Sequence, residues 1–155
     1  IRGVPVVVLL LVFYFIILTS ANGIFVAILT FGINSGAYMA ELIRGGINAV
    51  DNGQMEAGRS LGMSRFQATV HVVLPQAMKN ILPAIGNEFV TMVKETSIIQ
   101  YLGVGDLMYN NGIVVTATYN PLPCYYISAI IYLTLNIVLG KGLDLFERRM
   151  KCSDR

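Results

Sequence analysis

Five polar residues in the stretch 87–95 have types and spacing that could bind a charged solute. Glu88 and Glu95 are seven residues apart and would share one face of a helix, Asn87 and Lys94 would share the neighbouring face, and Thr91 would lie between the two. Ionisable groups inside a membrane cannot point at lipid, so they either neutralise one another across helices or line a hydrophilic cavity. A cavity would suit a zwitterion, because its ammonium needs an anion and its carboxylate needs a donor. The sequence leaves both interpretations open.

The stretch 24–43 carries a second polar face, formed by Asn34, Tyr38 and Glu41 at helical spacing. Asn34 and Tyr38 are interpreted either as hydrogen-bonding groups between helices or as part of a solute path. Glu41 lies near the predicted helix end and is expected to pair with Arg44. Roughly opposite, small residues recur every four positions, a pattern that lets another helix approach closely: Gly32, Gly36 and Ala40.

Composition indicates a membrane protein. Of the 155 residues, 55% are hydrophobic and only 13% are charged, where soluble domains average about 25% charged residues. The formal net charge of +2 gives no support to nucleic-acid binding. Cys124 and Cys152 are isolated, so neither a disulfide nor a metal site is expected. The single histidine, His71, has no serine or cysteine partner in reach, so no catalytic residues are expected.

The hydrophobic stretches predict an all-α membrane protein. A helix needs roughly 20 apolar residues to cross a bilayer, and four spans are predicted at about 4–20, 24–43, 81–104 and 124–143. The third span is the weakest, because it contains three ionisable residues. Pro83 is expected in its first turn, where a missing N–H costs little.

The basic residues predict the orientation of these spans. Of the eleven Lys and Arg residues, only Lys94 lies well inside a span, Lys141 lies at the end of the fourth span, and the connectors 21–23 and 105–123 contain none. Because positive loops face the cytoplasm, both ends of the chain and the segment 44–80 are predicted to be cytoplasmic. The two uncharged connectors are predicted to face outside.

The segment EAGRSLGMSRFQATVHVVLP, residues 56–75, is too polar to cross a membrane. Its composition predicts one short helix that ends near Gly62 and a second that begins after Ser64, a typical N-cap residue. Glycine disfavours helix interiors, so Gly62 indicates a turn. A loop that lies on the lipid headgroups is the alternative interpretation.

The same segment resembles a known family signature. It is similar to the EAA motif of permease subunits of ABC importers, which reads E-A-A-x-x-x-G, nine residues, I-x-L-P. The matching residues are Glu56-Ala57-Gly58, then Gly62 after three residues, then Val72-Val73-Leu74-Pro75 after nine more. Gly58 and Val72 depart from it without changing the spacing. Further stretches are similar to polar amino acid permeases, above all the glutamine type: residues 2–5, 36–41, 86–88, 94–97 and the tail 147–149.

This resemblance implies a five-helix type I importer permease core, of which residues 1–155 would hold four transmembrane helices. The start at Ile1 leads us to expect one further helix upstream. The resemblance also implies a cytoplasmic coupling helix in the region 54–75 that contacts a dimer of ABC ATPase subunits. The residues implied in this contact are Glu56, Ala57, Gly58, Gly62, Leu74 and Pro75.

The resemblance further implies alternating-access uptake of a polar amino acid, with glutamine foremost, across the cytoplasmic (inner) membrane of a prokaryote. The implied partners are an extracytoplasmic amino-acid-binding protein or domain, a second permease chain that is identical or a sister, and membrane lipid. The residues expected to meet the solute are Glu88, Asn87, Thr91, Tyr38 and Asn34.

No cofactor is expected in the chain itself. The sequence contains no G-x-x-x-x-G-K-[ST] motif, so ATP hydrolysis is expected on a separate subunit. The alternative function is an ion-coupled carrier or channel without an ATPase partner, with Glu88, Lys94 and Glu95 as a relay. Such a protein would have no need of the segment 56–75, which therefore distinguishes the two functions.

Overall fold

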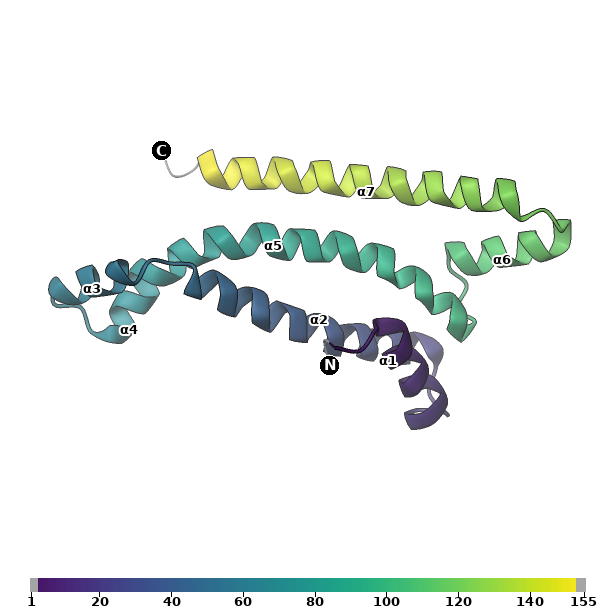
Figure 1. Ribbon diagram of the computed structural model, residues 1–155, viewed down its shortest axis with the longest axis horizontal. Helices are drawn as coiled ribbons and strands as arrows, with labels where there is room; N and C mark the ends of the chain where they lie inside the picture. Colours follow the sequence, from purple (N-terminus) through teal and green to yellow (C-terminus); the bar gives the residue numbers. More distant parts are fainter. Residues whose placement is uncertain (1–2, 153–155) are drawn as a thin grey trace.

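The computed structural model describes the backbone of residues 3–152 and the side chains of residues 3–146, and none of these residues forms a strand. Arg2 and the side chains of the 147–149 tail, both part of the family resemblance, lie outside the described residues. The helices follow one another in the order α1 (Val6–Val12), η1 (Phe13–Ile17), α2 (Gly23–Asn48), α3 (Asn52–Ser60), α4 (Arg65–Ala68), η2 (Thr69–Val73), α5 (Leu74–Glu95), η3 (Thr96–Leu102), α6 (Leu107–Thr118) and α7 (Pro121–Cys152). Figure 1 shows α2, α5 and α7 as long rods side by side, with α3 and α4 at one end and α6 at the other.

The first helix is shorter than the predicted span 4–20. The α-helical part α1 widens into the π-helical turn η1, and the helix ends before Leu18, whose backbone leaves the helical region (φ −116°, ψ 46°). Asn22 then begins α2, because its side-chain oxygen accepts a hydrogen bond from the Ile24 N–H at 2.8 Å. The connection between the two helices is therefore longer than the three-residue turn expected from the sequence.

Helix α5 begins earlier than predicted. It starts at Leu74, so Pro83 lies in the helix interior, and the proline in the first turn is Pro75. The expectation for Pro83 is wrong, because the preceding segment η2 leads into α5 without a break and the helix already begins nine residues before Pro83. An interior proline removes one backbone hydrogen bond and bends a helix, and Figure 1 shows α5 as a curved rod.

The connector 105–123, predicted as an outer loop, contains the helix α6. Asp106 caps this helix by accepting a hydrogen bond from the Tyr109 N–H at 2.7 Å. The helix ends at Tyr119, which adopts a left-handed backbone conformation (φ 52°). This turn directs the chain back, and α6 and α7 pack against each other as an antiparallel pair.

The outward surface of α7 is apolar, and its inward face is polar. Between residues 121 and 138 only four side chains are not exposed, and they recur every four positions: Cys124, Ser128, Tyr132 and Asn136. Large apolar side chains such as Ile130 and Leu133 are about 60% exposed. This arrangement is the reverse of a soluble protein and fits a helix surrounded by lipid.

Two helices of the described chain, Gly23–Asn48 and Pro121–Phe146, are long and apolar enough to cross a membrane. The third predicted span coincides with the end of α5 and with η3, and its crossing stays a prediction.

Close backbone approaches join the long helices. Gly46 of α2 packs directly against the Ile81 side chain of α5, and a Cβ atom at Gly86 of α5 would lie 2.9 Å from Leu143 of α7. By contrast, no described atom outside the local helix lies within 4 Å of a Cβ built at Gly32 or Gly36. The predicted stripe of small residues is therefore not used for packing within the described chain.

We expect Gly46→Ala to lower thermal stability, because the added methyl group would overlap Ile81. Overpacking of this kind costs about 1–3 kcal/mol, which corresponds to a melting temperature roughly 2–10 °C lower for a chain of this size. Gly45→Ala is the matched control, since its Cβ meets no described atom within 4 Å and alanine favours helix. Thermal unfolding in detergent, followed by circular dichroism, checks this. Equal melting temperatures for the two variants would contradict the packing.

Candidate functional site

All five predicted solute-binding residues lie on α2 and α5, which run antiparallel. Two contacts define their register: Gly46 meets Ile81, and a Cβ at Gly23 would lie 3.4 Å from the Leu102 Cβ. Between these contacts, and at equal rise per residue in both helices, Tyr38 of α2 is about level with Glu88 of α5. The tertiary structure thus sets at a similar level two residues that are 50 positions apart in the sequence.

The polar residues at this level differ in their burial. Asn34 is 5% exposed and its neighbour Ser35 is 8% exposed, and the Ser35 hydroxyl has no hydrogen-bond partner among the described residues. Tyr38, Glu88 and Thr91 are half-buried, whereas Asn87 is exposed. Asn87 and Thr91 are joined within α5, because the Thr91 hydroxyl donates to the Asn87 backbone carbonyl at 3.1 Å.

The acidic face of α5 follows from its helical geometry. Glu88 and Glu95 lie two turns apart on this helix and therefore share one face, and Lys94 directly precedes Glu95. Two carboxylates with one neighbouring ammonium group leave a net negative charge. Such a face can attract the ammonium group of a solute, and the Thr91 hydroxyl, which already donates within α5, can accept a hydrogen bond near it.

Sequence reasoning missed the polar face of α7. The Asn136 amide nitrogen donates to the Tyr132 carbonyl at 2.7 Å, and its side-chain oxygen is buried without a described partner. Tyr132 lies close to Ser97, which is near the start of η3. The recurrence of Ser128, Tyr132 and Asn136 every four residues in an otherwise apolar span was the signal that could have revealed this face.

The segment 52–73 forms a hairpin of two short helices, α3 and α4. As predicted, Ser64 caps α4: its hydroxyl accepts from the Gln67 N–H at 3.3 Å, and the Gln67 side chain accepts from the Ser64 N–H at 2.9 Å. Gly58 is buried, and a Cβ there would lie 3.2 Å from the Ala68 Cβ. Gly62 lies in the turn with φ +86°, a conformation that favours glycine.

The hairpin presents an unpartnered surface beyond the long helices. Glu56 and Ala57 are exposed on α3, and the side chains of Leu61 and Phe66 are 82% and 77% exposed. Exposed large apolar side chains beside polar ones mark protein interaction sites. Leu61 and Phe66 are additions to the residues predicted for this surface.

The hairpin is linked directly to α5. The Gln76 amide nitrogen donates to the Gln54 side-chain oxygen of α3 at 3.1 Å and to the Val72 carbonyl at 3.0 Å. Leu74 and Pro75 form the first turn of α5, so they lie at this junction and not at the tip of the hairpin. Helix α3 is therefore hydrogen-bonded to the helix that carries Glu88 and Glu95.

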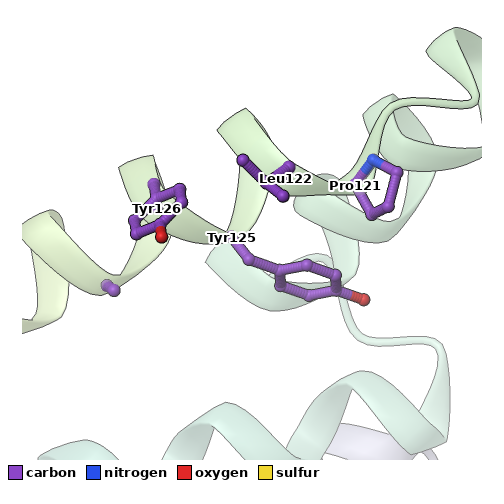
Figure 2. Close-up of a pocket in the computed structure, with 5 residues that line it drawn as sticks. Pro121, Leu122, Tyr125 and Tyr126 are labelled. Atoms are coloured by element: carbon purple, nitrogen blue, oxygen red, sulfur yellow. The ribbon is translucent and has the colours of Figure 1, made fainter.

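A hollow of about 510 Å³ lies at the start of α7, away from these residues. Figure 2 shows Pro121, Leu122, Tyr125 and Tyr126 around it, with the Tyr125 ring reaching outward from the helix. Its lining contains no charged side chain, so this hollow is not suited to a zwitterion.

Comparisons with known proteins agree on one family. Residues 1–151 match the family described as "Binding-protein-dependent transport system inner membrane component". The chain is 40% identical to the putative glutamine transport system permease protein of Rickettsia conorii, covering 96% of this chain and 70% of that protein. It is 39% identical to the arginine transport system permease protein of Bacillus subtilis (99% and 72% covered) and 35% identical to the glutamine transport system permease protein of Escherichia coli (97% and 71% covered).

A solved structure is also similar. The chain superposes on the crystal structure of an amino acid ABC transporter with histidines with a TM-score of 0.89 and 45% sequence identity, covering 96% of this chain and 71% of the other.

We expect Gly62→Val to destabilise the α3–α4 hairpin, whereas Gly62→Asn should be tolerated. No described atom lies within 4 Å of a Cβ at Gly62, so a difference in stability between the valine and asparagine variants would come from the backbone conformation at this position and not from a steric clash. A β-branched residue at positive φ costs about 1–3 kcal/mol, whereas asparagine adopts this region readily. Hydrogen–deuterium exchange of residues 52–73 should rise roughly tenfold or more in the valine variant. Equal exchange in both variants would rule out a left-handed Gly62.

Proposed function

The chain belongs to the family of binding-protein-dependent transport system inner membrane components, and we propose that it is the permease subunit of an ATP-driven importer for a polar amino acid, with glutamine as the first candidate. One observation carries this proposal: the exposed α3–α4 hairpin is hydrogen-bonded, through Gln54 and Gln76, to the helix that carries the acidic residues. The proposed docking surface and the proposed solute site are thereby joined through α5.

The hairpin is proposed to dock on an ABC ATPase dimer. An amphipathic helix that inserts into a groove offers its apolar residues as anchors, and Leu61 and Phe66 are available for this, beside Glu56 and Ala57. Gly58 allows α3 to lie close to α4, and Gly62 allows the turn between them. Closure of the ATPase dimer would then move the hairpin and α5 together, and the solute site would alternate between the two sides of the membrane.

The solute is proposed to bind between α2 and α5. Glu88 would meet the ammonium group, and Tyr38, Asn34, Asn87 and Thr91 would supply hydrogen bonds. Relatives named for glutamine and for arginine transport support a polar amino acid as the solute class. The uncharged glutamine side chain needs no further anion beyond those that bind its backbone ammonium.

The remaining partners follow from the same proposal. An extracytoplasmic binding protein or domain would deliver the solute, and a second permease chain, identical or a sister, would complete the pathway. The protein would lie in the inner membrane of a prokaryote with the hairpin and both chain ends in the cytoplasm. The absence of Lys and Arg from the connectors 21–23 and 105–123 supports this orientation.

The first test is ATP hydrolysis in proteoliposomes that contain the full-length protein, its candidate ATPase subunit and binding protein. We expect glutamine to stimulate hydrolysis, and the double variant Glu56→Ala, Gly62→Leu to lose this stimulation by roughly tenfold or more, as expected when central interface residues are removed. Asp144→Asn is the control, because it removes an exposed carboxylate near the end of α7 and should leave stimulation unchanged.

The outcomes separate the candidate functions. A wild-type complex that assembles and hydrolyses ATP but does not respond to glutamine would move the question to other amino acids. If the ATPase subunit does not bind, the proposal is overturned, and the ion-coupled carrier or channel becomes the better interpretation.

A second prediction concerns the solute site. Glu88→Gln keeps the shape of the side chain but removes its charge, so uptake should show a KM roughly 10- to 100-fold higher, in line with the loss of one partner of a charged pair. Assembly with the ATPase subunit should be unchanged, which co-purification measures. Uptake with wild-type kinetics in this variant would remove Glu88 from the solute site.

A further inference from the structure

A groove between α6 and α7 has apolar walls and a polar floor. Val114 of α6 and Ile127 and Ile131 of α7 form its walls, and Asn111 and Ser128 lie on its floor. Its volume is about 250 Å³. The groove lies on the far side of the molecule from the α3–α4 hairpin, and it takes no part in the proposed solute site.

The floor of the groove holds an unpaired donor. Asn111 is 8% exposed and Ser128 is 5% exposed. The Asn111 amide nitrogen is buried and has no hydrogen-bond partner among the described residues. Leaving a buried donor unpaired is unfavourable, and such groups in native proteins nearly always have a partner. The geometry therefore calls for an acceptor supplied by a molecule in the groove.

We propose that this groove binds a membrane phospholipid, with an acyl chain along the apolar walls and an ester carbonyl that accepts a hydrogen bond from the Asn111 amide nitrogen. Two of its wall residues, Ile127 and Ile131, are 59% and 38% exposed on the outward face of α7, and the chain belongs to a family of inner membrane components. A lipid that covers this face has its acyl chains at the mouth of the groove.

The chemistry of the lining favours an ester carbonyl over a charged group. Neither a basic nor an acidic side chain is present among the residues around the groove. A carboxylate, a phosphate or the zwitterionic solute would leave its charge without a partner there, at a large cost in desolvation. A neutral carbonyl needs only the one donor that Asn111 offers.

Tyrosines near the groove fit a position close to the membrane surface. Tyr119 is 90% exposed at the α6–α7 turn, and Tyr125 and Tyr126 are 53% and 65% exposed at the start of α7. Tyrosine is enriched where the hydrocarbon meets the headgroups, which is also where the ester groups of phospholipids lie. Figure 2 shows the two α7 tyrosines near Pro121 and Leu122, at the start of the helix.

The test uses the full-length protein in bilayers that contain phosphatidylethanolamine with a photoreactive acyl chain. After illumination, mass spectrometry measures lipid attached to the peptides that cover α6 and the start of α7. We expect wild-type labelling of these peptides, and labelling reduced about two- to tenfold in Asn111→Leu, the range expected from the loss of one neutral hydrogen bond. Thr116→Val is the matched control, because this exposed α6 hydroxyl donates to its own helix at Gly112.

A second variant, Ile127→Trp, fills the groove from its wall and keeps Asn111. It should reduce labelling as well, so the proposal does not depend on the folding of one variant. Labelling that is equal in the wild type and in both variants would overturn the proposal. So would attachment of a photoreactive residue placed at Val114 to another protein segment instead of lipid. The readout does not use transport activity, so its result is independent of whether the proposed function is correct.

Discussion

The close approach of α2 and α5 is the constraint on which the other features depend. At Gly46 the absence of a side chain lets Ile81 fill the space between the helices. In lipid, helix association has no hydrophobic driving force, so tight packing at small residues has to supply much of the stability. This contact and the one at Gly23 determine the register of the pair. The register in turn sets Tyr38 and Glu88 at the same depth.

The distribution of polarity follows from the surroundings of the helices. In α7 the apolar side chains face outward and the polar ones face α5 and α6. Lipid makes outward apolar side chains favourable and leaves buried polar groups to find partners inside the protein. The unpaired atoms of Ser35, Asn111 and Asn136 show that this pairing is incomplete within the described residues. Those positions are where a solute, water or lipid can complete the hydrogen bonding.

Helix α5 joins the α3–α4 hairpin, the proposed ATPase-docking surface, to the proposed solute site. Its first turn touches the α3–α4 hairpin through Gln76, and its second half carries Glu88 and Glu95. The π-helical turn η2 (Thr69–Val73) lies between the hairpin and α5, and such turns interrupt the regular hydrogen-bond ladder. The connection between the hairpin and the acidic residues therefore runs through a π-helical turn and then along α5, which Pro83 bends.

The sequence by itself determined much of this protein. Hydropathy, the EAA-type spacing and Ser64 as an N-cap all act within one helix or one turn, so residue order is enough to predict them. The sequence did not reveal α6 or the true start of α5, because helix ends depend on caps and on continuity with neighbouring segments. It also did not show that Gly46, rather than the Gly32 and Gly36 stripe, makes the close contact, or that Ser128, Tyr132 and Asn136 face inward. Those outcomes were decided by the tertiary structure, because they depend on which faces of separate helices meet. The residue order within each helix does not determine how two helices far apart in the chain are rotated and aligned against each other.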